Sequence, residues 1–177
     1  MPRIEKDFLG EKELPDTAYY GVQTLRGKEN FHITGIPMST EPYFVKAFGY
    51  AKKAAAMANR DLGVLDGKVA DAIIGACDRL IAGEMRDQFV TDFIQGGAGT
   101  STNMNANEVI ANRALELMGH HKGEYEHCSP HDHANASQST NDAYPTALHV
   151  GMALGNVRLM AAMKELIAAF RAKGKEF

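Results

Sequence analysis

The stretch TALHVGMALGNVRLMAAM, residues 146–163, decides the fold class of this 177-residue chain. Arg158 is its only formally charged residue, and its apolar side chains point in nearly every direction around a helix. Such a helix is buried on all sides. We expect no membrane span, because His149, Asn156, Arg158 and two glycines interrupt the run. If it continues to about Lys173, the helix is about 42 Å long at 1.5 Å per residue, and it needs partners.

Three helices are predicted upstream, at residues 42–60, 67–82 and about 102–118. Pro42 lies where a first helical turn favours proline, after Ser39 and Thr40 as candidate caps. Glycines at 63, 83 and 119 follow the three segments, as is common at helix ends.

Two further segments lack helical periodicity. Residues 1–40 contain turn-forming residues such as Gly10, Pro15 and Pro37 and are predicted to be an extended, irregular arm. In residues 88–94, apolar and polar residues alternate enough to predict a short strand or an extended segment. The chain is therefore predicted to be mainly α.

Composition excludes some classes of function. Lys plus Arg number 19 against 22 Asp plus Glu, a net charge of −3, and no basic block indicates nucleic-acid binding. The two cysteines, Cys77 and Cys128, are far apart in sequence and suit reduced thiols better than a disulfide framework. The N-terminus is charged and lacks the apolar region of a secretory signal, so we expect a cytoplasmic protein.

Two stretches are rich in small hydroxyl and amide side chains: QGGAGTSTNMNANE, residues 95–108, and NASQSTNDAYPTA, residues 135–147. Each lies where a helix is predicted to begin. One interpretation is helix capping, because the sequence from Ser139 to Asp142 fits the capping-box pattern, and Asn105 to Glu108 fits it more loosely. The other is a single anion site that combines both helix starts with neutral donors.

Residues that the two stretches lack limit the kinds of anion that the site could bind. No lysine near Gly99 fits a phosphate loop, and the dinucleotide pattern GxGxxG is not met. Uncharged hydrogen-bond donors suit a carboxylate whose charge increases during the reaction. When a proton is removed from the carbon beside the carboxylate, negative charge moves onto its oxygens, and fixed donors stabilise that state more than the ground state. No GxSxG turn supports nucleophilic hydrolysis. The pattern favours a lyase.

A histidine-rich segment follows the third helix. It contains His120, His121, His127, Cys128, His131 and His133. The spacing matches no standard zinc motif, so we expect a surface loop and no metal site. A role for His131 or His133 near an active site stays open.

The motifs GGAGTSTNMNANEV, KGEY and SQSTNDAYPTA resemble those of the aspartate ammonia-lyases, within the aspartase and fumarase superfamily. The resemblance runs from about Leu9 to the end of the chain. It implies an enzyme that reversibly converts L-aspartate to fumarate and ammonia without a cofactor. It also implies that Thr100, Ser139 and Thr140 bind the β-carboxylate and that Asn141 contacts the amino group.

The same resemblance implies a mostly helical domain with an extended arm over residues 1–139. Residues 140–177 then form the first long helix of a central bundle. The family assembles as a homotetramer in which each active site draws on three subunits, so the implied partners are other copies of the enzyme and a small-molecule substrate.

Some parts of the family pattern are missing. The glycine-rich GSSxMPxKxN loop, which supplies the family's general base, is not present, so no catalytic residue is expected in this chain and we predict that it is inactive alone. SPHDH, residues 129–133, differs from the HPNDD pattern of fumarases. Two alternatives are a fumarase, whose motifs read closer to SGTQS and SSND, and a noncatalytic helical interaction module.

Overall fold

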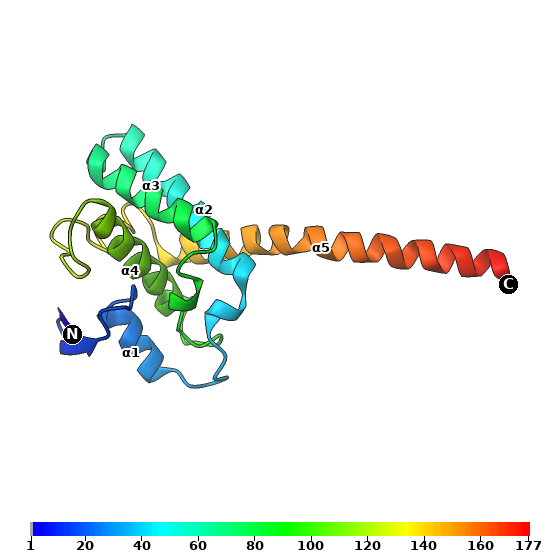
Figure 1. Ribbon diagram of the computed structural model, residues 1–177, viewed down its shortest axis with the longest axis horizontal. Helices are drawn as coiled ribbons and strands as arrows, with labels where there is room; N and C mark the ends of the chain where they lie inside the picture. Colours follow the sequence, from blue (N-terminus) through cyan, green and yellow to red (C-terminus); the bar gives the residue numbers. More distant parts are fainter. Residues whose placement is uncertain (1) are drawn as a thin grey trace.

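The computed structural model describes residues 2–177, and most of them are helical (Figure 1). The elements in chain order are β1 (Arg3–Asp7), β2 (Gly10–Leu14), α1 (Val22–Asn30), η1 (Met38–Thr40), α2 (Pro42–Asp61), α3 (Gly67–Ile81), η2 (Arg86–Gln88), α4 (Thr100–Leu117) and α5 (Thr140–Glu176). The two strands form one antiparallel hairpin, in which Arg3 pairs with Leu14. The prediction of a mainly α chain is confirmed.

The N-terminal segment is more regular than predicted. Residues 1–40 were expected to be an irregular arm, but they contain the hairpin and α1. The start of α1 is capped from a distant part of the chain, because the Glu108 carboxylate accepts the backbone N–H groups of Gly21, Gln23 and Thr24 at 2.8, 2.9 and 3.0 Å. A cap that lies 84 to 87 residues away in sequence leaves no local signal.

The predicted helices at 42–60 and 67–82 correspond to α2 and α3 within one residue at each end. Ser39 and Thr40 are not caps of α2, since they lie in η1 and Glu41 takes the N-cap position. The prediction of a strand at 88–94 is not met: Gln88 ends η2, and the following residues contain bends and one isolated bridge, between Asp92 and Pro37.

Helix α4 lies at the centre of the body, between α1 and α3 (Figure 1). It begins two residues earlier than predicted, after Gly99. Asn105 is not an N-cap: its side-chain oxygen accepts the backbone N–H of Val90 at 3.0 Å, and Glu108 caps α1 instead. The looser capping interpretation is therefore wrong, because both side chains are directed to neighbouring segments.

Helix α5 begins with the predicted capping box. Ser139 Oγ accepts the N–H of Asn141 at 3.1 Å, and Asp142 Oδ2 accepts the N–H of Ser139 at 3.3 Å. The first turns pack against α2, where the absence of a side chain on Gly151 allows close contact; a Cβ there would lie 3.1 Å from Phe44 Cα.

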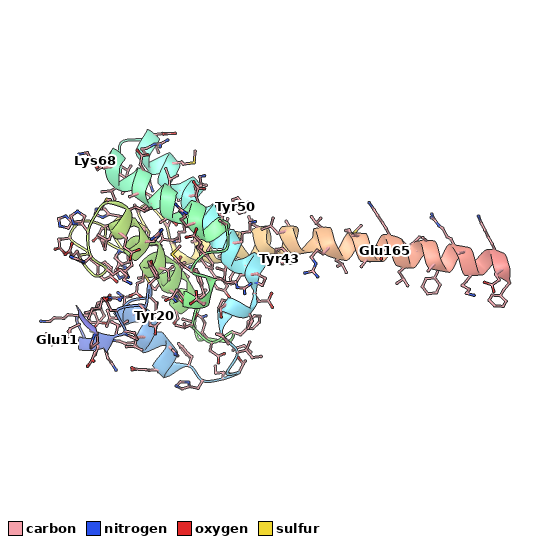
Figure 2. The ribbon with its side chains drawn as sticks, in the orientation of Figure 1. Glu11, Tyr20, Tyr43, Tyr50, Lys68 and Glu165 are labelled. Atoms are coloured by element: carbon pink, nitrogen blue, oxygen red, sulfur yellow. The ribbon has the colours of Figure 1, made fainter. Side chains whose placement is uncertain are left out.

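Beyond that contact, α5 projects away from the body (Figure 1). Residues 156–177 are exposed, and side chains around Glu165 extend freely in Figure 2. The sequence predicts that this helix is buried on all sides. Residues 2–177 alone do not bury it. Among those residues, no helix has both the length and the apolarity needed to cross a membrane.

Candidate carboxylate-binding site

The two polar stretches meet where α4 and α5 begin. A cavity of about 480 Å³ is lined by the loop Gly97–Gly99 on one side and by Asn141 and Tyr144 on the other. Asn103 of α4 connects the two helices, since its Nδ2 donates to Thr140 Oγ1 at 3.0 Å. Stretches about 40 residues apart in the chain therefore form one surface.

The four predicted substrate-binding residues lie at these two helix starts. Asn141 is exposed and lines the cavity directly. Thr140 is half-buried, and Ser139 is exposed with its hydroxyl used in the helix cap. Thr100 is exposed and is the first residue of α4, next to the cavity-lining Gly99.

The backbone at the start of α4 has an unusual conformation. Gly99 has φ +86°, a value that favours glycine, and any Cβ at this position would overlap the ring of Tyr144. Gln95 Oε1 accepts the N–H of Thr102 at 2.9 Å, which pairs one first-turn donor. The start of a helix carries a partial positive charge, so the beginnings of α4 and α5 favour an anion here.

A buried cation lies behind Thr140. Lys52 of α2 is 1% exposed, and its Nζ donates to Asn135 Oδ1 at 3.0 Å and to Gln138 Oε1 at 2.9 Å. Asn103 and Asn107 also donate to Asn135 Oδ1, each at 3.1 Å. Within residues 2–177 Lys52 forms no ion pair, and burial lowers the pKa of its ammonium group to about 7.

With this geometry established, comparison with known proteins gives the family. The family model described as Lyase matches residues 10–177. The chain belongs to the Lyase family. Its relatives include the aspartate ammonia-lyase of Helicobacter pylori, at 58% identity, and that of Escherichia coli, at 52%. Both alignments cover 99% of this chain and 37% of the relative, so this chain spans just over a third of the length of these relatives.

Solved structures give the same result. A Brucella melitensis protein described as fumarate lyase:delta crystallin bound to cobalt superimposes with a TM-score of 0.97 at 51% identity, over 100% of this chain and 38% of that one. A class II fumarase from Schistosoma mansoni superimposes with a TM-score of 0.79 at 36% identity, over 87% of this chain and 32% of that one. The resemblance to aspartate ammonia-lyases is confirmed.

Sequence reasoning missed Lys52 as a neighbour of the candidate site. A usable signal existed, because Lys52 lies four residues after Phe48 and four before Ala56, both of which are buried on the inner face of α2. A charged residue at such a position needs polar partners. Those partners, Asn135 and Gln138, lie in the second polar stretch.

The two histidines whose role the sequence leaves open, His131 and His133, make local contacts. His133 Nδ1 accepts the N–H of Ser129 at 2.9 Å, and His131 Nε2 lies 2.6 Å from Gln23 Nε2. Neither residue lines the cavity between α4 and α5.

Proposed function

We propose that this chain is the N-terminal part of an enzyme that reversibly converts L-aspartate to fumarate and ammonia. The observation that carries the proposal is the shared cavity at the starts of α4 and α5, joined by the contact between Asn103 and Thr140. Curated relatives at 51% to 58% identity are named aspartate ammonia-lyase. A fumarase is the second candidate, and the solved fumarase is less similar, at 36% identity.

The site suits the chemistry of this elimination. A base removes a proton from the carbon beside the β-carboxylate, and its electron pair moves onto the carboxylate to give a doubly charged intermediate. The C–N bond then breaks, a carbon–carbon double bond forms, and ammonia leaves. In the proposed site the hydroxyls of Thr100, Ser139 and Thr140 donate to the β-carboxylate, and Asn141 contacts the amino group. Donors of this kind stabilise the intermediate more than the substrate.

Lys52 supports the same site from behind. It is connected to Thr140 through Asn135 and Asn103, so it orients the Thr140 hydroxyl without touching the cavity. When protonated, it also places a positive charge on the side of the site opposite to solvent. Attraction between charges is stronger in a buried setting than in water.

The general base is proposed to come from outside these 177 residues, because no segment here has the pattern of the family's base-carrying loop. We propose that the complete enzyme is a homotetramer in which α5 packs against other helices. Residues 156–177 of α5 expose apolar side chains such as Val157 and Leu159 at 71% and 58%, which supports such packing.

The test uses the complete enzyme that contains this chain. Fumarate is followed by its ultraviolet absorbance with L-aspartate and L-malate supplied separately. Turnover of aspartate is expected, and Thr140→Val, which removes one hydroxyl donor at nearly constant volume, should lower kcat by about 10²-fold. Thr146→Val is the matched control, since Thr146 is an exposed threonine of the same helix that, unlike Thr140, does not accept a hydrogen bond from Asn103.

The alternatives predict different results. Turnover of malate alone would identify a fumarase. No turnover of either substrate, with an intact oligomer, would support the interaction module. Unchanged kinetics in both Thr140→Val and Asn141→Ala would show that the reaction occurs at another site.

A further inference from the structure

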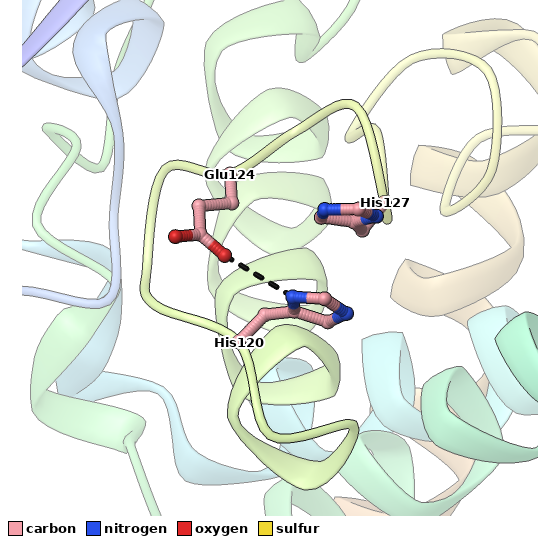
Figure 3. A group of neighbouring side chains, drawn as sticks. All are labelled: His120, Glu124 and His127. Atoms are coloured by element: carbon pink, nitrogen blue, oxygen red, sulfur yellow. Dashed lines mark hydrogen bonds and ion pairs between the residues drawn. The ribbon is translucent and has the colours of Figure 1, made fainter.

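Three side chains outside the proposed active site converge in the loop that follows α4. His120, Glu124 and His127 lie on successive turns of this loop and face one another (Figure 3). Their ligand atoms all lie within 4.8 Å of one another. The two imidazole rings stack, with their centroids 3.8 Å apart and 15° between their planes. We propose that these three residues bind one divalent transition-metal ion.

The spacing of the first two ligand atoms suits a metal ion. His120 Nδ1 lies 3.2 Å from Glu124 Oε2. Two ligands on a tetrahedral Zn²⁺ with bond lengths of about 2.1 Å are themselves roughly 3.4 Å apart. His127 is exposed, and within residues 2–177 neither of its ring nitrogens forms a hydrogen bond. The lone pair of an imidazole nitrogen lies in the plane of the ring, so the stacked His127 ring must turn out of the stack to direct a nitrogen at the ion, and no hydrogen bond of this ring within the described residues opposes that turn.

The loop holds these ligands in place without a metal. Gly119 and Gly123 adopt φ values of +85° and +90°, which bend the chain back toward α4. The N–H of Gly123 donates to Asn112 Oδ1 at 2.8 Å, and the nearby Tyr125 hydroxyl receives a hydrogen bond from Asn112 at 3.0 Å. Little conformational entropy is then lost when an ion binds.

The Glu124 carboxylate is held in place by its neighbours. The backbone N–H of His121 donates to Glu124 Oε2 at 3.2 Å. One oxygen of Glu124 already faces His120, so the negative charge is located where the cation would bind (Figure 3).

The ligand types indicate which metal is preferred. Two imidazoles and one carboxylate suit Zn²⁺, Co²⁺ or Ni²⁺, whereas Mg²⁺ and Ca²⁺ prefer sites made of oxygen ligands. A bound ion would connect the C-terminal end of α4 to the loop that leads toward Asn135 and the start of α5. The expected effect is stabilisation of this loop and not a step of the reaction. This inference differs from the expectation drawn from sequence spacing, because the turns at Gly119 and Gly123 bring together residues that match no standard motif.

The experiment titrates Co²⁺ into protein first treated with a chelator, above neutral pH, and follows the visible absorption bands of the bound ion. One Co²⁺ per chain is expected, with displacement by Zn²⁺ and no comparable displacement by Mg²⁺. His127→Ala and Glu124→Gln should each weaken binding by about tenfold or more, since each removes one of three ligands. His121→Ala is the matched control, because His121 contributes only its backbone N–H to the cluster.

Several results would overturn the proposal. The first is that no absorption bands appear at excess Co²⁺. The second is that His127→Ala binds Co²⁺ as tightly as the parent protein, or that His121→Ala weakens Co²⁺ binding as much as the ligand variants do. The third is that Mg²⁺ displaces Co²⁺ as well as Zn²⁺ does. Circular dichroism of each variant separates loss of a ligand from loss of folding. His127 is exposed, so His127→Ala keeps the test decisive if Glu124→Gln fails to fold.

Discussion

Helices α4 and α5 show opposite relations between composition and burial. Helix α4 carries four asparagines, two threonines and two glutamates, and yet almost all of residues 102–115 are buried. Helix α5 is rich in apolar residues, and yet residues 156–177 are exposed. In α4 most buried polar groups have a specific partner, which makes their burial tolerable. In residues 156–177 of α5 the apolar surface has no partner within the residues described.

The comparison teaches that burial in this chain follows available partners and not hydropathy alone. Glu108 illustrates the principle: burial raises the pKa of its carboxyl, and hydrogen bonds from Thr24 and Gln23 act in the opposite direction. Together with the N–H of Gly21, the backbone N–H groups of these residues give the carboxylate three partners. Three predictions test the comparison, beginning with the largest expected effect.

The largest effect is expected at Asn112 of α4. Its Nδ2 donates to the Tyr19 carbonyl at 2.8 Å and to the Tyr125 hydroxyl, and its Oδ1 accepts from Gly123. Asn112→Leu should lower the free energy of unfolding by about 2 to 3 kcal/mol, because it leaves buried groups unpaired. Asn107→Leu is the matched comparison and should cost about half as much or less, since Asn107 Oδ1 is already buried without a partner.

Chemical denaturation measures both variants against the parent protein. Equal losses for Asn107→Leu and Asn112→Leu would contradict the view that partners, and not polarity itself, decide how α4 is buried.

A smaller effect is expected from the pH dependence of stability. The pKa of Lys52 is lowered to about 7 in the folded state from an ordinary value of 10.5. Above pH of about 7 the folded protein releases this proton while the unfolded chain keeps it, so the unfolded state binds more protons and stability rises with pH. The rise should be about 2 kcal/mol between pH of about 7 and about 8.5.

Urea denaturation across this window measures the slope. Lys52→Met should lose this pH dependence of stability. Lys53→Met should keep it, because the Lys53 side chain lies at the surface and pairs there with Asp78 at 2.6 Å. At higher pH the trend should reverse, because burial raises the pKa of the Cys77 and Cys128 thiols to about 12. The same slope in Lys52→Met would show that another group causes the rise.

The smallest effect on folding is expected in the projecting part of α5. Leu159 is 58% exposed, so Leu159→Lys should change the free energy of unfolding by no more than about 0.5 kcal/mol. It should nevertheless reduce self-association, measured by light scattering during size-exclusion chromatography, because it interrupts the apolar surface. Glu165→Lys is a control at a position that is already charged. A loss in Leu159→Lys above about 1 kcal/mol would mean that this region packs within its own chain.

Local patterns predicted a large part of the fold. The helix periods at 42–60 and 67–82, and the Ser139–Asp142 capping box, depend on residues that are neighbours in sequence, and all three are confirmed. Helix α1 and the hairpin were missed, because α1 is capped by Glu108 from far along the chain. The division at residue 139 and the substrate roles of Thr100, Ser139, Thr140 and Asn141 stay predictions.

The sequence by itself determined the helical class, the family resemblance and the two hydroxyl-rich helix starts, because each is written in residues a few positions apart. Only the tertiary structure decided that those two starts share a cavity, that Lys52 lies buried behind one of them, and that His120, Glu124 and His127 face one another. The physical reason is that these arrangements depend on long-range packing and loop closure. Neither composition nor periodicity records which distant groups such packing brings within hydrogen-bond distance.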